Sequence, residues 1–177
     1  MQAISAVSSF LIAQEEIGGE ELMMTRMACE PSGRPYNHLE LKDGKIPHNP
    51  MINAGALMNT FSIWQDARPD RKFENYTEII SKMIDKGKVE FDNEMCLAEQ
   101  DKADKNKCLF YMLQEGGVIG ESEKVDSHME FYTETCNINL NVEEFATFAA
   151  TLANGGISPA HGERVFKDPD AVKNCLS

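Results

Sequence analysis

The chain has 177 residues, enough for one ordinary domain, and its 42% hydrophobic and 26% charged residues are typical of a globular protein. A formal net charge of −12 without any long basic run argues against nucleic acid or an anionic membrane as a partner. No apolar stretch approaches the ~20 residues that span a bilayer.

Apolar residues recur at helical spacing along most of the chain, and strand signals are sparse. Helices are expected at residues 4–15, 51–65, 71–86, 93–113, 122–136 and 142–153, with a last one after Asp168 and Pro169. Between the first two, turn residues dominate positions 29–50 and predict a long loop with one short extended piece near residues 39–41. The fold is therefore expected to be mainly α.

Several helix ends carry recognisable signals. Asn93 is expected to cap the helix over residues 93–113, and Gly87 to stop the one before it. Asn141 followed by Glu144 three residues later fits a capping box. The helix behind that box is expected to bury an apolar face made of Val142, Phe145, Ala146, Ala149, Leu152 and Ala153.

The five cysteines and four histidines are widely scattered, without a Cys-x-x-Cys pair or a metal-ligand spacing. This pattern predicts reduced thiols in an intracellular compartment, no metal and no cofactor. Residues 1–7 contain no Lys or Arg, so they resemble neither a secretory nor a mitochondrial targeting signal.

The most informative stretch runs from Pro47 to Ala56, PHNPMINAGA. Pro50 biases Asn49 toward an extended conformation, so a helix is expected to start just after it. Ala54, Gly55 and Ala56 leave little bulk beside Asn53. The segment therefore fits a loop-to-helix junction that a polar ligand can approach closely.

Several motifs in one order resemble the glutaminases, serine-dependent L-glutamine amidohydrolases that share the fold of penicillin-recognising enzymes. They are residues 30–33 (EPSG), 48–56 (HNPMINAGA), 131–132 (FY), 149–156 (AATLANGG), 162–166 (GERVF) and 171–174 (AVKN). The sequences of these motifs resemble those of the animal kidney- and liver-type enzymes more than those of bacterial ones.

This resemblance implies the helical lobe of an α+β serine-β-lactamase/DD-peptidase-like fold, with most of the sheet missing from this chain. Residues 1–177 would then be a single, partial catalytic domain, truncated at both ends relative to the family. The implied reaction is hydrolysis of L-glutamine to L-glutamate and ammonia. The resemblance further implies a homo-oligomer and a mitochondrial location.

The resemblance also places the family's substrate contacts on four residues. Asn53 and Tyr132 fall on its amide and phenol contacts, Glu99 on the carboxylate that binds the substrate ammonium, and Asn106 on the amide that binds the substrate carboxylate. Free glutamine is a zwitterion, so a carboxylate together with amide and phenol donors suits it. Glu99 and Asn106 are seven residues apart, which puts them on one face of a continuous helix and predicts a single pocket.

Each of these residues also has a purely structural interpretation. Asn53 fits a helix cap, Glu99 and Asn106 fit a solvated surface, and Tyr132 fits a core position with its hydroxyl bonded locally. Only their joint registration with the family favours a binding site.

The family's nucleophile is the serine of a Ser-x-x-Lys motif, in which the lysine activates the hydroxyl. No Ser-x-x-Lys occurs in this chain, and its first lysine is Lys42. Counting back without gaps puts Ile4 and Val7 at the two positions, whereas a shift of one residue offers Ser5 and Ser8. Ser5 is thus a weak nucleophile candidate without a base, and the alternative function is an inactive module that binds an amino acid or associates with full-length subunits.

The loop from Gly33 to Pro47 matches a family loop that lies beside the oligomer interface and adjusts activity. Without the resemblance, it would be interpreted as an ordinary surface loop.

Overall fold

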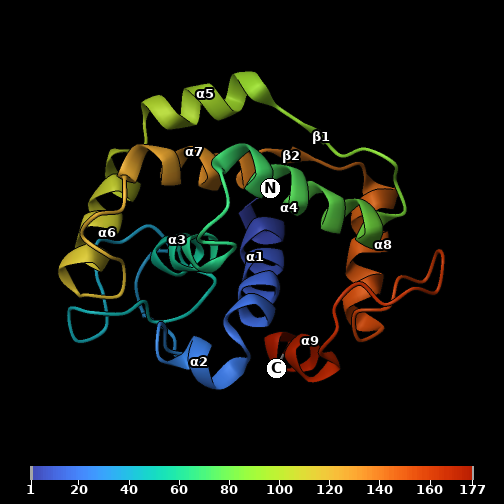
Figure 1. Ribbon diagram of the computed structural model, residues 1–177, viewed down its shortest axis with the longest axis horizontal. Coiled ribbons are helices and arrows are strands. Elements are labelled where there is room, and N and C mark those ends of the chain that lie inside the picture. Colours follow the sequence, from blue (N-terminus) through green and yellow to red (C-terminus); the bar gives the residue numbers. More distant parts are fainter. Residues whose placement is uncertain (1, 177) are drawn as a thin grey trace.

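The computed structural model describes residues 2–176, and this part of the chain is mainly helical, as predicted (Figure 1). Its helices are α1 (Gln2–Ile17), α2 (Glu20–Met24), α3 (Asn53–Ser62), α4 (Pro69–Ile84), α5 (Asn93–Asp101), α6 (Asp104–Glu115), α7 (Val125–Cys136), α8 (Val142–Ala153) and α9 (Pro169–Leu176). Strand β1 (Glu90–Phe91) pairs antiparallel with β2 (Ile138–Asn139), with Phe91 opposite Ile138.

Helix α3 lies at the centre of the core, and all ten of its residues are buried. It packs against α1, α6 and α7, which surround it in Figure 1. A Cβ on Gly55 would lie 2.0 Å from the carbonyl oxygen of Asn49, so only glycine allows the preceding loop to come this close. The junction at this glycine therefore fixes where the loop meets the helix.

Helix α3 begins at Asn53, two residues later than predicted. The side-chain oxygen of Asn49 accepts hydrogen bonds from the backbone N–H groups of Met51 and Ile52, at 3.0 and 3.2 Å. This turn occupies the donors that would otherwise open the helix, and the helix starts only after it.

The predicted helix over residues 93–113 is wrong as a single helix, because α5 ends at Asp101 and α6 begins at Asp104. Ala103 at the break is only 4% exposed, so burying it turns the chain between the two helices. The cap of α5 is Asp92 and not Asn93, since the Asp92 carboxylate accepts the N–H of Met95 at 2.9 Å. Both the cap residue and the helix break therefore differ from the prediction, because tertiary packing overrides local helix propensity here.

Helix α4 ends at Ile84 with Asp85 as its C-cap, and Gly87 is not the residue that stops it. Asp85 adopts the left-handed conformation (φ 54°), and the N–H of Lys86 bonds to the carbonyl of Ser81 at 3.1 Å. An aspartate tolerates this conformation better than most residues, and it takes the place that glycine usually holds.

The capping box of α8 is confirmed, since Asn141 and Glu144 bond reciprocally at 2.9 and 3.0 Å. The predicted buried face of this helix is wrong, because only Leu152 of its six residues is buried. Val142 is 85% and Phe145 40% exposed, and Ala146, Ala149 and Ala153 are exposed as well. The side chains that pack inward are Phe148, Thr151 and Leu152, and the hydroxyl of Thr151 donates to the carbonyl of Met83 in α4 at 2.8 Å. The helix is thus rotated from the predicted face by its contact with α4.

Helix α1 ends at Ile17, before Gly18 and Gly19, as the sequence predicted. It contacts α2, α3, α7 and α9. Within residues 2–176, every helix falls short of the length and apolarity that crossing a membrane requires.

Candidate functional site

A pocket of about 490 Å³ opens between the loop that precedes α3 and helices α3, α5, α6 and α7. All four residues proposed as substrate contacts line it: Asn53, Glu99, Asn106 and Tyr132. The other lining residues are Tyr36, Asn37, Met95, Ala98, Lys102, Ala103, Thr133, Cys136 and Asn137. The predicted convergence of the four side chains is therefore present in the fold, while their roles stay predictions.

Glu99 and Asn106 converge on the pocket in a different way from the one predicted. Glu99 lies on α5 and Asn106 on α6, so the two do not share a continuous helix face. They reach one pocket because the chain turns at Lys102 and Ala103 and sets the first turn of α6 beside the last turn of α5.

Two amides form a pair in this pocket. The side-chain NH₂ of Asn53 donates to the side-chain oxygen of Asn106 at 2.9 Å, and the backbone N–H of Asn53 donates to the carbonyl of Tyr36 at 2.9 Å. The Asn106 oxygen accepts this bond, and the NH₂ group of the same lining side chain is a further hydrogen-bond donor. An NH₂ group in this position can donate to a ligand carboxylate.

The carboxylate of Glu99 is held from the other side of the pocket. One of its oxygens accepts a hydrogen bond from the side chain of Asn137 at 2.8 Å, and the same NH₂ group donates to the carbonyl of Thr133 at 2.9 Å. Asn137 thereby ties the α5 carboxylate to the C-terminal end of α7. The Glu99 side chain is solvent-exposed, so a ligand ammonium can reach it.

Helix α7 supplies Tyr132, Thr133 and Cys136 to the pocket. Tyr132 is only 2% exposed. Burial raises the pKa of the Cys136 thiol, so this sulfur stays protonated near neutral pH. The floor of the pocket is therefore uncharged.

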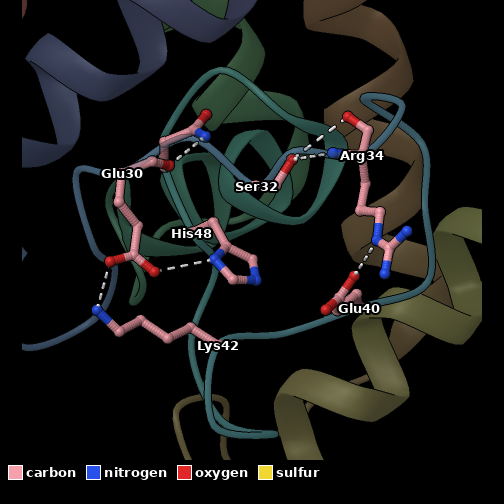
Figure 2. Close-up of polar contacts among 7 residues, drawn as sticks. Glu30, Ser32, Arg34, Glu40, Lys42 and His48 are labelled. Carbon is pink, nitrogen blue, oxygen red and sulfur yellow. Dashed lines mark hydrogen bonds and ion pairs between the residues drawn. The ribbon is translucent and has the colours of Figure 1, made fainter.

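The long loop before α3 forms one wall of the pocket through Tyr36 and Asn37, and Figure 2 shows how it is held. Glu30 accepts a bond from Lys42 at 2.7 Å and contacts the Nδ1 of His48 at 3.1 Å. The hydrogen bond from Lys42, followed by that from His48, lowers the pKa of the Glu30 carboxyl. Glu30 thereby links the start of the loop to Lys42 and His48 near its end.

A second set of contacts orders the far part of the same loop. Ser32 donates to the carbonyl of Arg34 at 3.3 Å, and the Arg34 guanidinium lies 3.4 Å from the Glu40 carboxylate (Figure 2). The short extended piece expected near residues 39–41 is not formed there, and the nearest β contact is a bridge between Lys42 and Ile46 just after it.

Ser5 lies behind the floor of this pocket and not among its lining residues, and it is completely buried. The Cys136 thiol donates to the Ser5 hydroxyl at 3.7 Å, and Ser5 lies 2.8 Å from the hydroxyl of Thr135. Thr135 donates to the carbonyl of Tyr132 at 2.8 Å, so the Ser5 proton is directed to Thr135. This chain of hydrogen bonds ends on a backbone carbonyl, which cannot accept the proton as a base.

The other position offered by the one-residue shift is equally occupied. Ser8 donates to the carbonyl of Ile4 at 2.6 Å and accepts from the Tyr76 hydroxyl at 2.6 Å. Burial raises the pKa of Tyr76 to about 12, so the phenol stays neutral. Ile4, which gapless counting places at the nucleophile, is a core residue with 2% exposure.

Sequence reasoning missed five polar residues of the pocket: Tyr36, Asn37, Lys102, Thr133 and Asn137. Lys102 follows Glu99 by three residues, so helical spacing from that proposed contact could have found it, whereas Asn137 follows Tyr132 by five residues and does not share its helix face. Nothing in the loop sequence indicates that Tyr36 and Asn37 turn toward α3.

The glutaminase family model matches residues 1–177. Glutaminase 2 of Clostridium perfringens is 33% identical over 169 residues, which are 94% of this chain and 54% of that protein. The mitochondrial liver isoform of rat glutaminase is 36% identical over 148 residues, 84% of this chain and 24% of that protein. The crystal structure of a Bacillus glutaminase matches with a TM-score of 0.87 at 30% identity, over 99% of this chain and 58% of that one. The chain thus spans between about a quarter and about half of these relatives.

Proposed function

Because this chain belongs to the glutaminase family, we propose that it holds the L-glutamine site of a protein that hydrolyses L-glutamine to L-glutamate and ammonia. The observation that carries the proposal is the single pocket lined by Asn53, Glu99, Asn106 and Tyr132. Residues 1–177 would form one domain, part of the family's catalytic domain.

The charges of the pocket suit a free amino acid. The Glu99 carboxylate would accept the substrate α-ammonium, because one of its oxygens is fixed by Asn137 and the side chain remains exposed to the pocket. The NH₂ group of Asn106, whose oxygen is occupied by Asn53, would donate to the α-carboxylate. Tyr132 on α7 would contact the substrate from the floor.

Two outcomes are open at the chemical step, and they depend on Ser5. Hydrolysis through an acyl-enzyme requires a nucleophile that loses its proton to a base. Membership of the glutaminase family favours hydrolysis. In favour of the second candidate function, binding without turnover, stands the burial of Ser5 and its hydrogen bond toward Thr135, with no lysine or arginine anywhere on α1.

The test combines binding and turnover on the same protein. Titration calorimetry with L-glutamine and D-glutamine measures binding, and a coupled assay measures the release of glutamate. Ser5→Ala is compared with Ser9→Ala, which removes a buried hydroxyl from the same helix.

Each result separates the candidates. Binding of L-glutamine with turnover that only Ser5→Ala abolishes would establish a glutaminase with Ser5 as its nucleophile. Binding without turnover would establish the second candidate. A chain that binds neither enantiomer would overturn the glutamine site altogether.

The location and assembly of the protein are further proposals. The rat relative named mitochondrial supports a mitochondrial location, although bacterial relatives match as well. A homo-oligomer that uses the loop from Gly33 to Pro47 is proposed from the family resemblance. Light scattering across a concentration range tests this, and a monomer at every concentration would refute it.

A further inference from the structure

We propose that Lys102 is a second carboxylate anchor in this pocket, a specificity-determining residue that pairs with the α-carboxylate of a bound amino acid. The inference deepens the proposed function and rests on it. It makes the pocket selective for ligands that keep a free α-carboxylate next to an α-ammonium.

The first observation is the charge of the pocket. Among its lining residues, Glu99 carries the one carboxylate and Lys102 the one ammonium. A free α-amino acid carries one charge of each sign on neighbouring groups. The pocket therefore offers an opposite charge to both ends of a zwitterion, whereas the amides of Asn53 and Asn106 offer dipoles only.

The second observation is the position of Lys102. It is the C-terminal cap of α5, three residues after Glu99, and its backbone N–H donates to the Glu99 carbonyl at 3.1 Å. Residues three apart on a helical turn lie on the same side, so the two side chains leave the end of α5 toward one pocket. A ligand whose ammonium sits at Glu99 thus has its α-carboxylate on the side where Lys102 and Asn106 lie.

The third observation is that Lys102 is not engaged elsewhere. Three of the other lysines are paired: Lys42 with Glu30, Lys86 with Glu144 and Lys107 with Asp126. The exposed side chain of Lys102 forms no ion pair with Glu99 or with any other carboxylate of residues 2–176. The Lys102 ammonium can therefore turn to a ligand without breaking an existing ion pair.

The experiment compares L-glutamine with L-glutaminamide, which keeps the ammonium and the side-chain amide but lacks the α-carboxylate. Calorimetric Kd values are measured for the chain and for its Lys102→Met, Lys102→Arg and Lys105→Met variants. Lys105 is an exposed lysine in the first turn of α6 outside the pocket, so it is the matched control.

Lys102→Met is expected to weaken L-glutamine about tenfold, the effect of losing one charge-assisted contact, and to leave the Kd of L-glutaminamide within about twofold. Lys102→Arg is expected to keep the affinity within about threefold, and Lys105→Met to change nothing. Because Lys102 is exposed, the melting temperature should be the same in all variants.

Three results would overturn the inference. Equal weakening of both ligands by Lys102→Met would show that the lysine does not sense the α-carboxylate, and no weakening of either would show that it does not touch the ligand. If L-glutamate, titrated as a third ligand, lost far more affinity than L-glutamine in Lys102→Met, the lysine would instead meet the side-chain end. A chain that binds none of these ligands overturns the proposed function as well, whereas normal glutamine binding in Lys102→Met overturns this inference alone.

Discussion

Replacing Glu99 by glutamine tests whether the pocket recognises an ammonium group. The substitution keeps the size of the side chain and an oxygen that accepts the 2.8 Å hydrogen bond from Asn137, but it removes the negative charge. The scaffold should therefore be unchanged, and the effect should be confined to the ligand.

The magnitude follows from the contact that is lost. A hydrogen bond to a charged group is worth about 1.5–3 kcal/mol, and the exposed position of Glu99 favours the lower end because water screens the charge. About 1.5 kcal/mol corresponds to a roughly tenfold weaker Kd for L-glutamine. Titration calorimetry measures this Kd directly.

The matched control is Glu94→Gln, which removes an exposed carboxylate from the first turn of the same helix but outside the pocket. It should leave the affinity unchanged. If Glu99→Gln bound L-glutamine as tightly as the unmodified chain, or if Glu94→Gln weakened binding equally, an ammonium site at Glu99 would be refuted.

Three further changes probe stability, each read from urea unfolding. Gly55→Ala should cost about 3 kcal/mol, because its Cβ would lie 2.0 Å from the Asn49 carbonyl oxygen, whereas Gly87→Ala meets no atom within 4 Å and should be nearly neutral; equal costs would contradict the close contact. Burial lowers the pKa of His128 from 6.5 to about 4, so stability should fall by about 3 kcal/mol between pH 6.5 and pH 4, and His128→Gln should lose this part of the slope. Burial, and then the charge of Glu130, raise the pKa of Glu134 from 4.5 to about 7. The stability that Glu134 contributes is therefore full below pH 4.5 and is lost as the pH rises through 7. Glu134→Gln should show a smaller loss of stability from pH 5 to pH 8, and an unchanged loss would contradict the shift.

The features of the fold that sequence predicted best are those decided within one turn of helix. The capping box of Asn141 and Glu144 and the end of α1 before Gly18 depend on neighbouring residues alone. The break between α5 and α6 places Ala103 in the hydrophobic core, and no local signal marks it.

The face of α8 failed for a related reason. Its sequence has apolar residues around more than one side, from Val142 and Phe145 to Phe148 and Leu152, so periodicity alone allowed two orientations. The hydrogen bond from Thr151 to the Met83 carbonyl and the packing on α4 select the second. A polar residue that packs inward was thus the deciding contact, and a hydrophobicity pattern gives it no weight.

For the candidate site, alignment with the family's motifs predicted which residues line the pocket better than the expected helix geometry did. Glu99 and Asn106 were expected together because of a continuous helix that does not exist, yet both line the pocket. Lys102 lies at the break itself, so the departure from one helix is also what brings this additional charge to the pocket.

The elements that build the pocket are distinct from the helix that holds Ser5. The lining residues come from the loop before α3 and from α3, α5, α6 and α7, whereas Ser5 lies on α1 behind Cys136. Contacts such as Asn53 with Asn106 and Glu99 with Asn137 do not pass through α1. Ser5 meets the pocket through the 3.7 Å hydrogen bond from the Cys136 thiol, so Ser5→Ala is expected to remove that contact and to leave the four proposed substrate contacts in place. Measured affinity for L-glutamine that survives Ser5→Ala unchanged would follow directly from this arrangement, and affinity lost with that hydroxyl would contradict it.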